Sequence, residues 1–203
     1  MNAAPQPRES HRGQAEDAHV RLLATFIILD DAVKVEYQVE SKGGAPLLLY
    51  DALTRPAHDG MPKYDRLLAY VSFEEPSTLG LKRLVAPLPE LKDVEMAQQP
   101  WAHKLMPGGV VTGEIRVPLP AEEYSPYYLP DRRSVYRKAS ADRLKLVLGY
   151  VQLTGGLQSV PVPDTPELYE AEGEGATQQQ IEVVVRLDRP VAVKRRSDMF
   201  EPV

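Results

Sequence analysis

Aromatic and basic side chains gather in residues 120–142, which carry the strongest chemical signal in the chain. Tyr and Arg are enriched at protein interaction surfaces, because each combines a large contact area with a directional polar group. This stretch therefore predicts a loop that binds a protein or peptide partner. The alternative is that its tyrosines pack onto the fold and its arginines are solvated. The candidate binding residues are Tyr124, Tyr127, Tyr128, Arg132, Arg133 and Tyr136.

A second candidate lies in the segment PWAHKLMPGG, which contains Trp101 and His103. A Trp beside prolines can line a sugar or peptide site, although a lone Trp more often fills one end of a core. We therefore add Trp101 and His103 to the candidate binding residues.

The histidines and aspartates form no recognisable metal or catalytic motif. Zinc-type HExxH spacing and calcium-type DxDxDG spacing are both missing, and so are GxSxG, Walker, GxGxxG and SxxK patterns. We expect no metal, no cofactor and no catalytic residue, which argues against an enzyme without excluding one. The residues considered are His11, His19, His58, His103, Asp51, Asp59 and Asp65.

The elements that must position these residues are predicted to be strands. Val33, Val35, Tyr37 and Val39 alternate with polar neighbours, which is the period of a half-buried strand and not of a helix. The glycines in SKGGAP then predict a turn, after which LLLY begins a partner strand. Residues 32–56 are thus expected to form a hairpin or a corner between two sheets.

Further strands are expected along the chain, with long connections between them. A short helix is possible at residues 89–99, and one helical turn around Leu168 and Tyr169. Connections of this length are usually functional or disordered. The expected strands cover residues 19–29, 67–73, 79–85, 110–119, 143–153, 181–187 and 191–194, and the long connections cover residues 52–66, 86–109, 120–142 and 154–180.

The composition indicates one globular domain. The chain has 203 residues, a net charge of −5 and no cysteine, so disulfides and thiol catalysis are excluded and nucleic acid is a poor partner. Residues 1–18 are expected to be a disordered tail, 19–196 a single β-sandwich, and 197–203 a loose C-terminus. No apolar stretch has transmembrane length. Residues 1–18 also lack the apolar core of a signal peptide, so the chain is either cytoplasmic or an exported protein without its leader.

Two stretches, VEYQVESKGGAPLLLY and MPGGVVTGEIRVPLP, resemble the strand–turn–strand pattern of bacterial immunoglobulin-like domains. The resemblance implies an all-β, antiparallel two-sheet sandwich with long loops and one or two short helical turns. The Cys…Trp…Cys signature of antibody domains is absent, so no functional residue follows from the resemblance.

Three functions are compatible with this sequence. The leading hypothesis is a non-enzymatic binding or accessory module that acts through its long loops or through an exposed sheet edge. The alternatives are an enzyme whose site is assembled from Asp, Glu, His and Tyr residues of the loops, and a structural subunit of a larger assembly or homo-oligomer. A deep pocket with converging titratable groups would favour the enzyme.

Overall fold

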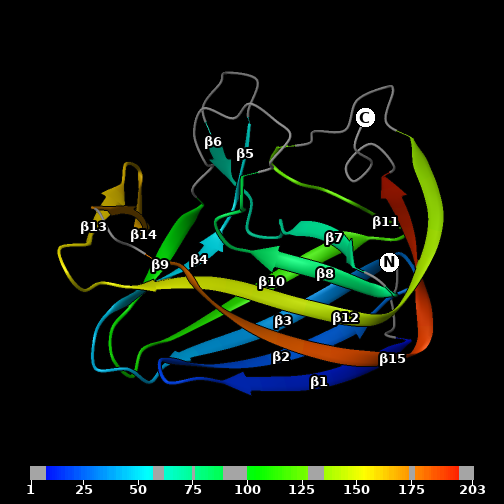
Figure 1. The fold of residues 1–203 in the computed structure, drawn as a ribbon, viewed down its shortest axis with the longest axis horizontal. Helices are drawn as coiled ribbons and strands as arrows, with labels where there is room; N and C mark the ends of the chain where they lie inside the picture. Colours follow the sequence, from blue (N-terminus) through cyan, green and yellow to red (C-terminus); the bar gives the residue numbers. More distant parts are fainter. Residues whose placement is uncertain are drawn as a thin grey trace, which may run out of the picture.

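The fold is all-β, as predicted. The computed structural model describes residues 8–56, 62–74, 76–88, 100–127, 135–173 and 177–196, and these residues form fifteen strands and no helix. The strands are arranged in two main sheets with a mostly antiparallel pairing, which confirms the expected sandwich (Figure 1). Within the described residues, no helix is long and apolar enough to span a membrane.

The first sheet, which we call sheet A, is built from the alternating strand recognised in the sequence and its neighbours. Its inward-facing residues pair across the strands, so that Phe26, Val35 and Ile115 form one fully buried row. All its pairings are antiparallel. The order is β1 (Glu9–Glu16), β2 (Val20–Ile28), β3 (Ala32–Ser41) and β10 (Val110–Pro118), which leaves β1 and β10 as the edge strands.

The second sheet, sheet B, is organised around two long strands, β12 (Tyr136–Gln152) and β15 (Gln179–Arg196). Two of its pairings are parallel, β8 with β12 and β11 with β15. A separate two-stranded ribbon is formed by β5 (Thr54–Pro56) and β6 (Pro62–Tyr64). The remaining strands of sheet B are β4 (Leu47–Ala52), β7 (Tyr70–Glu74), β8 (Thr78–Arg83), β9 (Trp101–Leu105), β11 (Ala121–Glu122), β13 (Gln158–Val162) and β14 (Thr165–Glu172).

The main core lies between the two sheets, and three smaller clusters of buried residues lie outside it. In β12, the residues from Leu146 to Val151 are all buried, because one set faces sheet A and the alternate set lies under loop residues. Leu146 belongs to the main core, whereas Val147 packs with Leu53, Leu68 and Tyr127. This agrees with the run of apolar residues expected for a strand buried on both faces.

The structure differs from expectation in three respects. The segments expected to be long connections also contain strands, whose short runs carry no clear apolar alternation; these are β5 and β6 in residues 52–66, β9 in 86–109, β11 and the start of β12 in 120–142, and β13 and β14 in 154–180. Residues 9–16, assigned to a disordered tail, form edge strand β1. The segment with the expected helical turn at Leu168 and Tyr169 is strand β14, whose Leu168 pairs with His103 of β9. The possible helix at 89–99 and the loose C-terminus at 197–203 lie outside the described residues.

Candidate functional site

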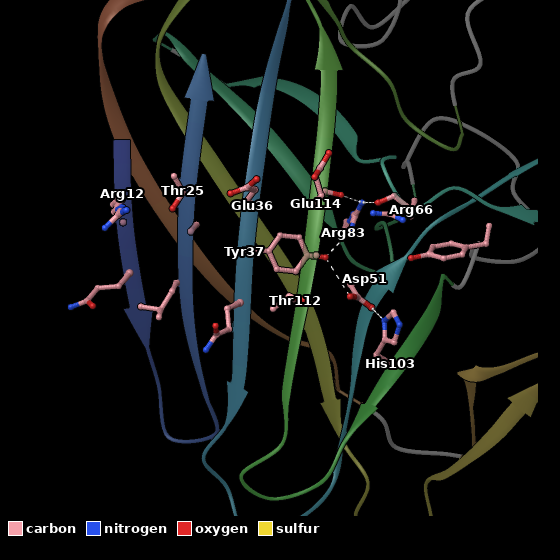
Figure 2. A pocket seen from close by; sticks show the side chains of 17 residues that line it. Arg12, Thr25, Glu36, Tyr37, Asp51, Arg66, Arg83, His103, Thr112 and Glu114 are labelled. Carbon is pink, nitrogen blue, oxygen red and sulfur yellow. Dashed lines mark hydrogen bonds and ion pairs between the residues drawn. The ribbon is translucent and has the colours of Figure 1, made fainter. Parts of the chain in front are cut away.

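A pocket of about 960 Å³ lies along sheet A and ends at the strands of sheet B (Figure 2). Its size is in the range of pockets that hold small molecules or peptide segments. All four strands of sheet A contribute to its lining. At one end the lining is completed by Asp51, Tyr64, Arg66, Arg83 and His103.

Most side chains in the sheet A part of the pocket are polar, because they occupy outward-facing positions of each strand. The strand register places these positions in two cross-strand rows. The Nζ atom of Lys34 lies 2.7 Å from Glu36 and 3.2 Å from Glu114, so it neutralises part of their charge. The rows are Arg12, Thr25, Glu36 and Glu114, followed by Gln14, Leu23, Gln38 and Thr112.

Tyr37, at the register position between these rows, faces the interior of the sandwich, and its ring extends from β3 across β10. Its register partner on β10 is Gly113, and a Cβ atom added to Gly113 would lie 2.2 Å from Tyr37 Cζ. The glycine is therefore required for the tyrosine ring to pass over β10. As a result, the buried Tyr37 hydroxyl reaches the side chains of Asp51 and Arg83 from sheet B (Figure 2).

Four side chains form a continuous hydrogen-bonded network at this end of the pocket. Arg83 Nη1 donates to Tyr37 Oη at 2.6 Å, and Tyr37 Oη donates to Asp51 Oδ2 at 3.3 Å. Asp51 Oδ1 lies 2.6 Å from His103 Nδ1. Arg83 and Asp51 are only 1% and 2% exposed, so their opposite charges compensate each other inside the protein through the tyrosine hydroxyl.

The network sets the protonation of two of its members. Burial raises the pKa of Tyr37, which keeps its hydroxyl protonated and able to donate to Asp51. The hydrogen bond to Asp51 raises the pKa of His103, because the carboxylate favours the imidazolium. Since Nδ1 is engaged by Asp51, Nε2 is the ring nitrogen of His103 that a ligand can reach.

Arg83 has an internal structural role. Besides Tyr37, it donates to three backbone carbonyls: Nε to Leu68 at 2.8 Å, and Nη2 to Arg66 at 2.5 Å and Glu114 at 2.7 Å. These carbonyls belong to the segment before β7 and to the edge of β10. The arginine thus joins the two sheets, whereas His103, with 23% of its side chain exposed, is the member of the network best placed to contact a ligand.

The predicted aromatic and basic loop contributes to the core beside sheet B. Tyr124 forms an isolated bridge with Val71, and its ring centroid lies 6.1 Å from that of Tyr70. Tyr127 is 8% exposed, and its hydroxyl donates to the carbonyl of Ala86 at 3.1 Å. Both tyrosines therefore pack onto the fold and do not line the pocket.

The other candidates are dispersed. Half-buried Tyr136 is the first residue of β12, and Trp101 donates from Nε1 to Glu170 Oε1 at 2.9 Å, outside the pocket. His103 is the candidate, among those described, that lines the pocket. Tyr128, Arg132 and Arg133 lie outside the described residues.

The sequence reasoning missed Tyr37 and Arg83 as site residues and considered Asp51 only as a calcium ligand. The sequence does carry one indication for Asp51, because this charged residue directly follows the apolar run LLLY. In the structure, every residue of this strand is buried. A charged residue inside such a run must have a buried partner.

Comparison of the chain with protein-family models, curated proteins and solved structures gives no match. Its function is therefore argued from the geometry of the pocket.

Proposed function

We propose that this protein is a binding module that takes up an extended peptide segment of low net charge in the pocket along sheet A. The observation that carries the proposal is the position of the pocket at the edge of β10 around Thr112, where no described strand pairs with it, next to His103. An extended peptide can add to such an edge through backbone hydrogen bonds, while neighbouring pockets select its side chains.

The backbone of β10 supports this mode of binding. Arg116 N–H donates to Leu67 and the Glu114 carbonyl accepts from Arg83, so these groups point away from β3. Backbone groups on a strand alternate between its two edges, and Thr112 therefore directs its N–H and C=O to the same side, into the pocket. Val110, two residues before Thr112 on β10, is 54% exposed and offers an apolar contact.

The charges of the lining favour a ligand with little net charge. Glu36 and Glu114 share Lys34, and Arg12 adds a second positive charge in the same row. Because positive and negative side chains are balanced along sheet A, this part of the pocket has no field that would select a strongly acidic or basic ligand.

Selection from a random heptapeptide display library tests the proposal. Peptides enriched on the wild-type protein are expected to lose at least about tenfold in affinity for Thr112→Pro, which removes the edge N–H without disturbing the pairing with β3. Arg21→Gln is a matched control, because Arg21 lies on the same face of sheet A but outside the pocket. Equal binding to wild type and Thr112→Pro, or no enrichment, would contradict the proposal.

A second candidate function is hydrolysis by general base catalysis, which the Asp51–His103 pair favours. A buried carboxylate on Nδ1 orients the imidazole so that Nε2 can take a proton from water next to a bound substrate. Chromogenic esters and phosphate esters are suitable probes. Hydrolysis by the wild type that is lost in both His103→Gln and Asp51→Asn would support this function, and equal rates in all three proteins would exclude it for these substrates.

A further inference from the structure

Strands β1 and β15 face each other along one side of the sandwich, although they belong to different sheets (Figure 1). Their contact is close at Gly13, where an added Cβ would lie 2.3 Å from Val183 Cγ1. Glu9 and His11 precede Gly13 at intervals of two residues, so all three share the strand face turned toward β15. This places a carboxylate and an imidazole between the sheets.

Asp188 of β15 completes a cluster with these two residues. One potential ligand atom from each of Glu9, His11 and Asp188 lies within 4.8 Å of the other two. The side chains of His11 and Glu9 are 18% and 12% exposed, and His11 Nε2 lies 3.3 Å from Glu9 Oε2. Asp188 is exposed and lies at the rim.

The Nε2 atom of His11 is the observation that points to a ligand. It is buried and makes no hydrogen bond to a described residue, because the 3.3 Å contact with Glu9 Oε2 is not aligned as one. A buried polar atom without a partner indicates a missing water or ion. Here oxygens of two carboxylates lie within 4.8 Å, which makes a cation the fitting occupant.

We propose that Glu9, His11 and Asp188 bind a zinc ion. Zinc ligands at about 2.0–2.2 Å in tetrahedral geometry lie about 3.4 Å apart, close to the distance between His11 Nε2 and Glu9 Oε2. The imidazole disfavours calcium and magnesium, which prefer oxygen ligands throughout. Asp188 supplies the third ligand after a small rotation of its side chain, and water supplies the fourth.

The backbone around the cluster supports the ligand geometry. Asp188 N–H donates to Glu9 Oε2 at 3.2 Å, which fixes the carboxylate as hydrogen bonds around metal sites commonly do. The two residues are 179 positions apart in the sequence, so no local spacing could reveal them. A zinc ion here would join the edge strand of sheet A to sheet B and stabilise the β1 side of the sandwich.

Calorimetric titration of the tag-free, EDTA-treated protein with ZnCl₂ tests the site. We expect about one zinc ion per chain, and an affinity at least about tenfold weaker in His11→Ala and in Asp188→Ala. Asp188 is exposed, so its variant removes a ligand without disturbing the core, and far-ultraviolet circular dichroism verifies the folding of each variant. His19→Ala is the matched control, because it removes a histidine outside the cluster and should retain wild-type affinity.

Thermal denaturation gives an independent measurement of the same site. Zinc is expected to raise the midpoint of the wild type and of His19→Ala, and to raise that of Asp188→Ala less at the same zinc concentration, because an ion that binds the folded state stabilises it more when it binds more tightly. The proposal is overturned if zinc does not bind the wild type, or if it binds His11→Ala and Asp188→Ala as tightly as the wild type.

Discussion

Replacing Arg83 with Met should cost the protein a large part of its folding free energy. Arg83 is 1% exposed, and its guanidinium makes four hydrogen bonds, all to acceptors inside the protein. Methionine has a similar length and fills the space with apolar atoms, but it donates no hydrogen bond. The substitution therefore removes the donors and leaves the acceptors in place.

The expected magnitude follows from the burial of these acceptors. The bonds to the Leu68 carbonyl and to Tyr37 Oη are buried, whereas those to Arg66 and Glu114 are only partly buried and can be replaced by water. An unsatisfied buried acceptor costs about 1–3 kcal/mol, and the loss of one partner of a buried charged group costs about 3–5 kcal/mol. We expect the free energy of unfolding to fall by about 3–5 kcal/mol, out of the roughly 5–15 kcal/mol typical of a domain.

Equilibrium unfolding in urea measures this loss, with the fluorescence of Trp101 and far-ultraviolet circular dichroism as probes. Arg12→Met is the matched control, because Arg12 is exposed on β1 and its substitution should change stability by less than about 0.5 kcal/mol. A loss of unfolding free energy below about 1 kcal/mol for Arg83→Met, with an unchanged slope of that free energy against urea concentration, would show that the hydrogen bonds of Arg83 between the two sheets do not stabilise the fold.

Two further predictions concern the neighbours of Arg83. The hydrogen bond to Asp51 raises the pKa of His103 in the folded state. Protonation of His103 therefore stabilises the fold fully at a pH below 6.5, the pKa in the unfolded chain, and this stabilisation disappears as the pH rises through the pKa of the folded state. His103→Gln should therefore destabilise more at about pH 5.5 than at about pH 8.5 in urea unfolding, and a loss independent of pH would contradict the pairing. Gly113→Ala should lower stability by about 1–3 kcal/mol in thermal melts, because the new methyl group meets the Tyr37 ring. Gly44→Ala, with no atom within 4 Å of the new Cβ, should be neutral or stabilising, and equal losses for the two would show that the ring contact is unimportant.

The strands that the sequence predicted correctly are those with a periodic apolar pattern. From Val33 to Val39, apolar and polar residues alternate in the sequence as buried and less buried positions do in β3. In β12, the apolar run that begins at Leu146 is buried on both faces. Strand β1 could not be recognised in this way, because its inward positions are Glu9, His11, Gly13 and Ala15 and have no apolar signal. It is ordered by pairing with β2 and by contact with β15, both of which are tertiary effects.

Of the four residues in the hydrogen-bonded network, His103 is the one that the sequence indicated as a binding residue. His103 was singled out by its residue type, but its partner Asp51 lies on β4 and the rest of the network comes from β3 and β8. These residues meet because of the strand register and because Gly113 leaves room for the tyrosine ring of β3. Neither condition can be read from neighbouring residues in the sequence. Tyr124 and Tyr127, in contrast, lie in a sequence stretch rich in Tyr and Arg, but they serve in packing.

The pairing of β12 with a strand that follows it in the chain has a consequence during synthesis on the ribosome. β15 is the antiparallel neighbour of β12 along nearly its whole length, so β12 keeps an unpaired edge until residue 196 has emerged. Open strand edges recruit strands of other nascent chains, and pairing between distant segments is slow. Chains that terminate before Gln179 should consequently accumulate as aggregates, in contrast to a protein whose sheets are completed in the order of translation.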